Sequence, residues 1–324
     1  MILTLEFDNM HYKIGFAGTP YIAREFLKEF VKDEKFQVDF VITNSAKAKG
    51  RGQKISQSEV GEFAINNKIP CYSHDNLKNF DESLLKNLNA MIVIAYGALI
   101  PKKLLYISWI NLHASLLPRW RGAAPIQYAI LNGDTVTGLT AMLIEEKMDA
   151  GAIIDQCEIK IQNDTTQSLI EKILMKRSWF TNTVAKYLNK EIDTQAQNEN
   201  YVTFANKIKK EDGVVNWNDD ANVIERKIRA FSVWPGVKYL IQNTEYKLIK
   251  CIACDDCEFL ELNTKNGDMI IFENKLYIVC GKGFLRILKL QKAGSKVITS
   301  EEFLCGFLSN FSFCEKIHIV KKCN

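Results

Sequence analysis

The sequence predicts an α/β fold with a mostly parallel sheet in its first part and a smaller, strand-rich second part. A buried strand is predicted over Tyr12–Gly18, an amphipathic helix follows the Gly18-Thr19-Pro20 turn, and a second strand covers Phe36–Thr43. A strand, a helix and a strand in this order favour a right-handed crossover between parallel strands. Later in the chain short strands and turns replace this alternation, which is typical of a small β-barrel.

The first part continues with further helices and strands. Apolar residues at helical or strand spacing predict helices over residues 60–66, 81–88, 123–132 and 165–188, and strands over 90–95, 108–113, 139–144 and 153–161. Such a sheet is Rossmann-like. Its first turn contains Gly15-Phe-Ala-Gly18, however, where a nicotinamide-binding turn has Gly-x-Gly-x-x-Gly, and we therefore exclude a nicotinamide site.

The chain is expected to form two domains joined by a polar connection. Residues 1–190 are assigned to the first domain, and residues 191–212 to a linker because they are polar and lack periodicity. Residues 213–324 form the second domain. It is predicted to hold a helix over 217–231, strands over 238–241, 246–254, 268–272, 275–279 and 284–291, and a last helix over 300–307.

Length and composition bound the class of protein. A chain of 324 residues with 47% hydrophobic content can bury one large core or two smaller ones. No apolar run approaches the roughly 20 residues of a membrane span. The first residues lack the basic region, apolar segment and cleavage site of a signal peptide. We therefore expect a cytoplasmic protein, without a membrane partner and monomeric.

The cysteines predict neither a disulfide framework nor a metal site. Their number is nine, which is odd, and they are scattered, so free thiols are expected. Cys251, Cys254 and Cys257 have the spacing of metal ligands. Because no second pair of cysteines or histidines follows to complete a tetrahedral set, no metal is expected, and the cluster stays unexplained.

Basic residues are concentrated in two places. The net charge is +4, and the excess lies after residue 204, since acidic and basic residues balance before it. The polar loop over residues 44–58 carries no acidic residue, and loops of this length are usually functional or disordered. Its charge suits a phosphate backbone, although a solvated surface explains the count equally well. The residues in question are Lys47, Lys49, Arg51 and Lys54 in the loop and Lys207, Lys209 and Lys210 after the linker.

Three polar residues form a candidate site for acyl transfer. Asn111 and His113 are two residues apart on a predicted strand, so their side chains project to the same face. An amide donor beside an imidazole can polarise a carbonyl and handle a proton. Asp149 adds a carboxylate on a loop that ends in a glycine. The same residues also fit structural roles: a satisfied buried histidine, a turn-capping asparagine and an Asx turn.

The string around this pair resembles the signature of folate-dependent formyltransferases. It runs Asn-Leu-His-Ala-Ser-Leu-Leu-Pro over residues 111–118 and continues Arg-Trp-Arg-Gly-Ala-Ala-Pro-Ile-Gln over 119–127. The second part resembles most closely the members that act on methionyl-tRNA. Further matching segments span nearly the whole chain in order: residues 16–20, 50–52, 95–97, 149–151, 229–231 and 234–236.

The resemblance implies a reaction and roles for the candidate residues. It implies transfer of a formyl group from 10-formyltetrahydrofolate to the α-amino group of initiator methionyl-tRNA. Asn111 and His113 would stabilise the oxyanion. Asp149 would hold His113 protonated and oriented and relay the amine proton through a water to N10. The strand-rich domain would be an OB-like barrel that binds tRNA.

The resemblance also implies contacts with the two substrates. The roles of Arg119 and Arg121 are left open. They could contact the folate glutamate tail or tRNA phosphate, or they could be exposed charges. Ser115, Leu116, Leu117 and Pro118 match the folate-binding segment, and Tyr96, Gly97 and Leu99 are expected beside the pterin. In the family, the arginine equivalent to Arg51 sits on an insertion that wedges into the acceptor end of the tRNA. The lysines named above would support that contact.

Three other functions fit parts of the sequence. A related formyltransferase could act on glycinamide ribonucleotide or an amino-sugar nucleotide, although the basic loop and the second domain argue against a small free substrate. A hydrolase could release formate from the same folate, and an assay with an amine acceptor separates the two. In a non-catalytic RNA-binding protein the α/β part would be a scaffold, and His113→Ala would leave function intact.

Overall fold

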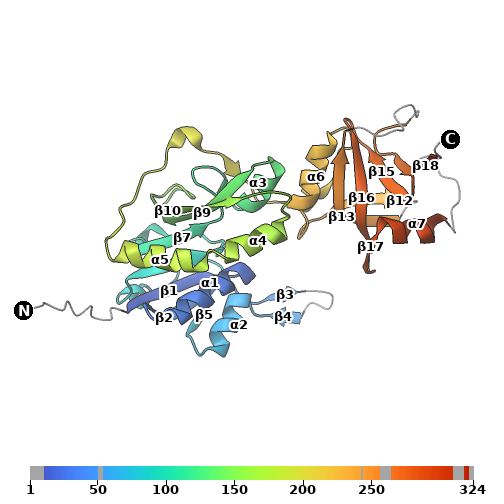
Figure 1. Cartoon of the computed structure of the whole chain (residues 1–324). Helices are drawn as coiled ribbons and strands as arrows, with labels where there is room; N and C mark the ends of the chain where they lie inside the picture. The colour runs from blue at the N-terminus through green and yellow to red at the C-terminus, as the bar shows by residue number, and fades with distance from the viewer. Residues whose placement is uncertain (1–10, 50–53, 242–243, 256–263, 309–316, 321–324) are drawn as a thin grey trace, which may run out of the picture. The chain divides into compact units, whose positions relative to one another are not determined.

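A computed structural model of the chain describes residues 11–49, 54–241, 244–255, 264–308 and 317–320 (Figure 1). The chain forms two compact units. One comprises Met1–Pro125, Val136–Lys160 and Ile170–Asn206, and the other Ile126–Thr135, Ile161–Leu169 and Lys207–Asn324.

The first unit is built on a seven-stranded sheet in the order β10-β9-β7-β6-β1-β2-β5. Its strands are β1 (Tyr12–Gly18), β2 (Phe36–Thr43), β5 (Cys71–Ser73), β6 (Ala90–Ile94), β7 (Ser108–His113), β9 (Val136–Leu143) and β10 (Ile153–Lys160). The five strands from β7 to β5 are parallel, and β9 and β10 run antiparallel at one edge. The mostly parallel α/β sheet predicted from the sequence is confirmed.

Helices α1 (Tyr21–Lys32) and α5 (Arg177–Leu188) pack together beside this sheet (Figure 1). Phe30 of α1 contacts Phe16 of β1 and Phe180 of α5, with ring centroids 6.4 and 5.8 Å apart. A second cluster contains residues from the alternate positions of β1, β2 and β6, with Leu77, Leu85 and Trp109. Because both faces are covered, the central strand β6 is buried along its whole length, as parallel strands usually are.

The carboxyl ends of β1, β6 and β7 meet at one edge of the sheet. The strand order reverses between β1 and β6, because the chain builds β2 and β5 on one side of β1 and β6 and β7 on the other. In open α/β sheets ligands bind outside the carboxyl ends of the strands at such a switch point. His113 is the last residue of β7 and therefore lies at this edge.

Smaller elements complete the first unit. They are the β3 (Lys47–Lys49) and β4 (Lys54–Ser56) hairpin, α2 (Glu59–Asn66), the short 3-10 helices η1 (Glu82–Leu85), η2 (Lys102–Leu104) and η3 (Glu199–Tyr201), and the parallel pair of β8 (Arg121–Gly122) with β11 (Phe204–Ala205). The loop predicted over 44–58 thus contains a hairpin. Residues 81–88 form a 3-10 turn and not the helix that we predicted.

The prediction of one long helix over residues 165–188 is wrong. Two helices replace it, α4 (Thr166–Leu174) and α5, which begins at Arg177. The amides of Met175 and Lys176 bond to carbonyls three residues back, so the chain tightens and turns between the helices. No glycine or proline marks this break, and the apolar spacing continues across it.

The second unit is dominated by a mainly antiparallel sheet. Its main path runs β12-β13-β16-β15-β14-β18, and β17 pairs with β16. The strands are β12 (Val237–Ile241), β13 (Thr244–Cys254), β14 (Met269–Phe272), β15 (Lys275–Val279), β16 (Phe284–Lys292), β17 (Val297–Thr299) and β18 (Ile317–Val320). The helical segments are α3 (Pro125–Leu131), η4 (Lys210–Gly213), α6 (Ala221–Ala230) and α7 (Ser300–Leu308). The predicted strand-rich second part is confirmed.

The helix predicted over residues 217–231 begins later, at Ala221. The Asp220 carboxylate accepts a hydrogen bond from the amide of Asn222 at 2.8 Å and caps the helix there. Ile224 and Ile228, one turn apart, are buried. The helix was therefore predicted, but its start was placed too early.

Candidate active site

His113 is buried at the carboxyl end of β7 with both ring nitrogens facing polar groups. Its side chain is 6% exposed, and Nε2 lies 2.8 Å from the backbone oxygen of Trp120. A carbonyl oxygen can only accept, so Nε2 carries the proton of this bond. This fixes the ring and leaves Nδ1 as the nitrogen that faces the second partner.

That partner is Asp149, the carboxylate of the predicted site. Its Oδ2 lies 3.8 Å from Nδ1 of His113 and accepts a hydrogen bond from the amide of Gly122 at 2.8 Å. The carboxylate is mostly buried, with 18% of its side chain exposed. A proton on Nδ1 would therefore form an imidazolium paired with a carboxylate that is itself held in place.

Asn111 lies on the same strand two residues before His113, and strand geometry places both side chains on the same face. Its backbone is fixed between Val93 of β6 and Met142 of β9. The side chain is half-buried, and within the described part of the chain its carboxamide makes no hydrogen bond. A fixed but uncommitted amide is available to a ligand.

Three residues around this edge have a left-handed backbone although they are not glycines. They are Ala95 after β6 (φ 47°), Trp120 (φ 62°) and Asp149 (φ 49°). Such conformations cost about 1–3 kcal/mol each and persist only where the surroundings enforce them. Two of the three residues face the His113 ring, Trp120 through a hydrogen bond and Asp149 as an ion-pair partner 3.8 Å away, which favours a functional role for this arrangement over a passive one.

The segment 115–118 is held against β9 and β10. The Thr140 hydroxyl donates to the Ser115 carbonyl at 2.7 Å and accepts from the Leu117 amide at 3.0 Å. The Gln156 carboxamide donates to the Leu117 carbonyl at 2.9 Å. Ser115 and Leu117 are buried, so the side chains of this segment that a ligand can reach are those of Leu116 and Pro118, which are half-buried.

The turn after β6 presents mainly backbone groups to a ligand. Tyr96 is 1% exposed, and its hydroxyl donates to the His74 carbonyl at 2.5 Å. Burial raises the pKa of the Tyr96 phenol to about 12. Gly97 and Leu99 are exposed. The turn therefore offers a ligand the Gly97 backbone and the Leu99 side chain, whereas the Tyr96 ring belongs to the core.

The structure separates the two arginines whose roles the sequence left open. Arg121 is 1% exposed, and its guanidinium bonds to Gln197 and Glu199, so it is neither an exposed charge nor free for a phosphate. Arg119 is half-buried and stacks over the Trp120 ring at 4.3 Å. Sequence reasoning missed Gln197, because nothing in a polar segment distinguishes a hydrogen-bonded glutamine from a solvated one.

Glu199 links Arg121 to Lys147 and is expected to make stability depend on acid pH. Hydrogen bonds from Arg121 and then Lys147 lower the pKa of Glu199 from 4.5 to about 2. Because the folded pKa is depressed, the stabilisation is present above pH 4.5 and is lost as the pH falls toward 2. The urea midpoint of the wild type should exceed that of Glu199→Gln at neutral pH, and the difference should shrink below pH 4.5. A difference that stays constant down to pH 2.5 would contradict the pairing.

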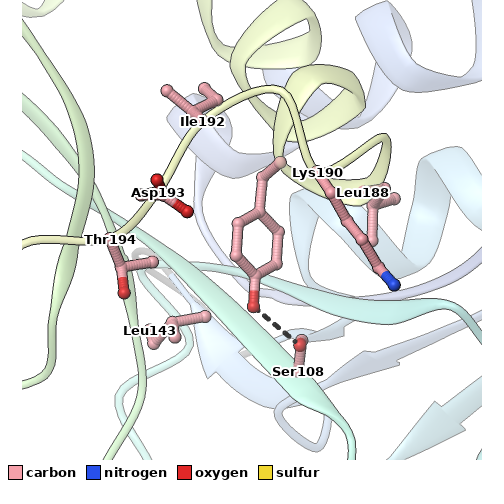
Figure 2. A pocket seen from close by; sticks show the side chains of 8 residues that line it. Ser108, Leu143, Leu188, Lys190, Ile192, Asp193 and Thr194 are labelled. Carbon is pink, nitrogen blue, oxygen red and sulfur yellow. Dashed lines mark hydrogen bonds between the residues drawn. The ribbon is translucent and has the colours of Figure 1, made fainter.

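A hollow of about 440 Å³ lies at the other end of β7 (Figure 2). The Tyr187 and Ser108 hydroxyls are 3.1 Å apart in it. It is lined by Ser108, the first residue of β7, and by Leu143, Tyr187, Leu188, Lys190, Ile192, Asp193 and Thr194. His113 stands at the opposite end of the same strand, so this hollow is not part of the site described above.

The candidate tRNA contacts are placed only in part. Lys47, Lys49 and Lys54 lie on the β3–β4 hairpin, whereas Arg51 lies outside the described residues. The three lysines at 207, 209 and 210 are exposed, and Ile208 between them is buried. The segment therefore turns its charges outward.

The remaining predictions concern cysteines and membranes. Cys251 is buried in β13 and Cys254 is half-buried, and Cys257 lies outside the described residues. Among the residues that the structure describes, no three His, Cys, Asp or Glu side chains gather as metal ligands. No helix in the described ranges is both long and apolar enough to cross a bilayer.

Comparison with known proteins identifies the relatives of the chain. The formyl transferase family matches residues 13–184, and the formyl transferase C-terminal domain matches residues 207–308. The chain is 40% identical to the methionyl-tRNA formyltransferase of Buchnera aphidicola subsp. Schizaphis graminum, over 90% of this chain and 94% of that protein. It is 36% identical to the methionyl-tRNA formyltransferase of Campylobacter jejuni, over 91% and 96%.

A solved structure shows the same fold. A sugar 3N-formyl transferase, WlaRD, matches with a TM-score of 0.63 and 24% identity, over 88% of this chain and 99% of that one. At this identity the likeness concerns the fold alone. The two family models together match most of the chain, and the two relatives are 36–40% identical to it along nearly their full length. The chain therefore belongs to the methionyl-tRNA formyltransferases of the formyl transferase family.

Proposed function

We propose that the chain transfers the formyl group of 10-formyltetrahydrofolate to the α-amino group of initiator methionyl-tRNA. One observation carries this proposal: the His113 ring is fixed between the Trp120 carbonyl and the Asp149 carboxylate, with the uncommitted Asn111 amide on the same face of the strand. The names of its relatives agree with the same substrate.

The bound folate supplies the formyl group, and the protein supplies charge stabilisation and a proton path. The amine nitrogen bonds to the formyl carbon, the bond from that carbon to N10 breaks, and one amine proton passes to N10. Negative charge develops on the formyl oxygen during attack. The Asn111 amide donates to that oxygen, and an imidazolium at His113 stabilises the same charge. Asp149 holds His113 in orientation and relays the proton through a water.

The carboxyl edge of the sheet fits a folate. It presents the Gly97 backbone and the Leu99 side chain, which are exposed, and the half-buried Leu116 and Pro118. Apolar side chains with a few backbone groups are what a flat heterocycle requires. The core beneath this surface includes the buried side chains of Ser115, Leu117 and Tyr96. We assign the pterin ring to this edge.

The tRNA is assigned to the basic residues. Arg51 with Lys47, Lys49 and Lys54 would contact the acceptor end, and Lys207, Lys209 and Lys210 the backbone farther along. In this assignment residues 1–190 carry the chemistry, 191–212 connect, and 213–324 hold the tRNA. The protein would act as a monomer in the cytoplasm, where charged initiator tRNA is used.

Incubation of the purified chain with 10-formyltetrahydrofolate and methionyl initiator tRNA tests the proposal. N-formylmethionine should appear on the tRNA, and tetrahydrofolate should form in equal amount. Release of formate without tRNA would indicate a hydrolase. Formylation of an amino-sugar nucleotide or glycinamide ribonucleotide, without formylation of tRNA, would indicate a small-molecule transferase.

The basic loop makes a separate prediction. Arg51→Ala should raise the KM for methionyl-tRNA and reduce the salt dependence of tRNA binding, because one phosphate contact is lost. The KM for the folate should stay unchanged. Steady-state kinetics at several salt concentrations measure both quantities. Lys32→Ala, which removes a charge at the end of α1, is the control. A rise in the folate KM with Arg51→Ala would show that the assignment of this loop is wrong.

A further inference from the structure

Residues 195–205 contact the two residues that face the His113 ring nitrogens, Trp120 and Asp149. Gln195 pairs with Ile153 through two backbone bonds of 2.8 Å. The Trp120 amide donates to the Thr203 hydroxyl at 2.9 Å, and β11 pairs with β8 immediately after Trp120. On the other side Gln197 reaches the loop that carries Asp149. A segment whose composition predicted a linker is thus hydrogen-bonded against the candidate site.

Gln197 uses its whole carboxamide in four hydrogen bonds. Its nitrogen donates to the backbone oxygens of Asp149 and Gly151, at 2.9 and 2.8 Å. Its oxygen accepts from Nε and Nη2 of Arg121, at 3.0 and 2.8 Å. Because a guanidinium only donates and a carbonyl only accepts, only one orientation of the amide satisfies all four bonds.

The loop that Gln197 holds needs support. Asp149 has a left-handed backbone (φ 49°), which a residue with a side chain adopts only under constraint. Gly151 packs so tightly that a Cβ there would lie 1.9 Å from the Leu143 oxygen. Two hydrogen bonds from a single donor group to the carbonyls at 149 and 151 pin the loop on both sides of Ala150.

Arg121 makes this support rigid. Its buried guanidinium bonds to Gln197 and to Glu199, and Glu199 bonds to Lys147 at the start of the same loop. The series from Lys147 through Glu199, Arg121 and Gln197 back to Asp149 therefore closes a ring around residues 147–151. Arg121 also directly precedes Gly122, whose amide holds the Asp149 carboxylate.

We propose that Gln197 is a positioning residue for formyl transfer, which fixes the Asp149 carboxylate against His113 through the backbone of residues 149 and 151. This proposal rests on the proposed function of His113 and Asp149. Gln197 does not touch the reacting atoms. Its effect is therefore expected in kcat and not in the KM of either substrate.

Gln197→Glu is the sharpest test because it keeps the shape and the partner of Arg121. The new carboxylate still accepts from the guanidinium, but its second oxygen meets two carbonyl oxygens where an N–H₂ group stood. We expect kcat to fall by about 10- to 100-fold, in the range that a misplacement of about 1 Å costs. The KM values should change little, because Gln197 does not touch either substrate. Gln197→Ala should lower kcat as well.

Gln195→Ala is the matched control. Gln195 is the same residue type in the same segment, and its side chain is exposed and makes no hydrogen bond to the described residues. Its kcat should equal that of the wild type. Loss of activity in Gln195→Ala equal to that in Gln197→Ala would indicate a general disturbance of the segment and would overturn the proposal.

A double variant decides whether Gln197 acts through Asp149. In an Asp149→Ala background Gln197→Glu should lower kcat by less than twofold, because residues that act as one unit are not additive. The proposal would be overturned if the losses in kcat from the two substitutions multiplied in the double variant, or if Gln197→Glu alone kept full activity. Either result would leave the proposed function intact. Full activity of Asp149→Ala would instead contradict the role given to Asp149.

Discussion

His113→Ala should lower kcat for formyl transfer by about 10²- to 10³-fold, the cost of removing one group that stabilises the developing oxyanion. The ring is 6% exposed and spans the gap between the Trp120 carbonyl and the Asp149 carboxylate. The Asp149 carboxylate cannot replace the imidazole there, since it offers only acceptors when ionised. Binding of tRNA and folate should persist, because no role in holding either substrate is assigned to the imidazole.

Single-turnover assays with saturating substrates measure the loss, and filter binding measures retention of tRNA. His11→Ala is the matched control, since His11 is exposed and lies before β1. His113→Gln separates chemistry from packing, because its amide can still donate to the Trp120 carbonyl. Unchanged kcat in His113→Ala would contradict the role given to His113, whereas tRNA binding without formyl transfer by the wild type would favour the non-catalytic RNA-binding function.

Local patterns predicted the elements that carry the site. Alternation along residues 108–113 defined β7 at both ends and put Asn111 and His113 on one face. The crossover from β1 to β2 predicted the parallel sheet, and parallel order implies that strand ends meet at one edge. The proximity of His113 and Asp149, 36 positions apart, came from the family resemblance and not from spacing.

The features that the sequence did not predict depend mainly on hydrogen bonds between segments that are far apart in the chain. Polar composition predicts a linker over residues 191–212 because it carries no information about partners. Gln197 and Thr203 bond to groups about 50 and 80 positions away. The burial of Arg121 was hidden for the same reason, since an arginine is ordinarily exposed unless it is paired. The break near Met175 lacked any glycine or proline signal.

Asn111→Ala should lower kcat by about 10²- to 10³-fold, the cost of removing one donor to a developing oxyanion. Its backbone is fixed by β6 on one side and β9 on the other, so the amide stays aimed without any side-chain partner of its own among the described residues. Such a fixed donor needs no reorganisation when charge develops. This is the condition under which a hydrogen bond contributes more to the transition state than to the ground state.

Asn111→Asp tests the sign of the charge. The two side chains have the same shape, but a carboxylate would face the oxygen on which negative charge develops and cannot donate when ionised. Its kcat should fall below that of Asn111→Ala, whereas a role limited to packing predicts the reverse order, since aspartate fills the space and alanine does not. Ser108→Ala, at the amino end of the same strand, controls for general damage to β7. Because the two roles rank the variants oppositely, one comparison of kcat values at neutral pH distinguishes an oxyanion donor from a structural asparagine.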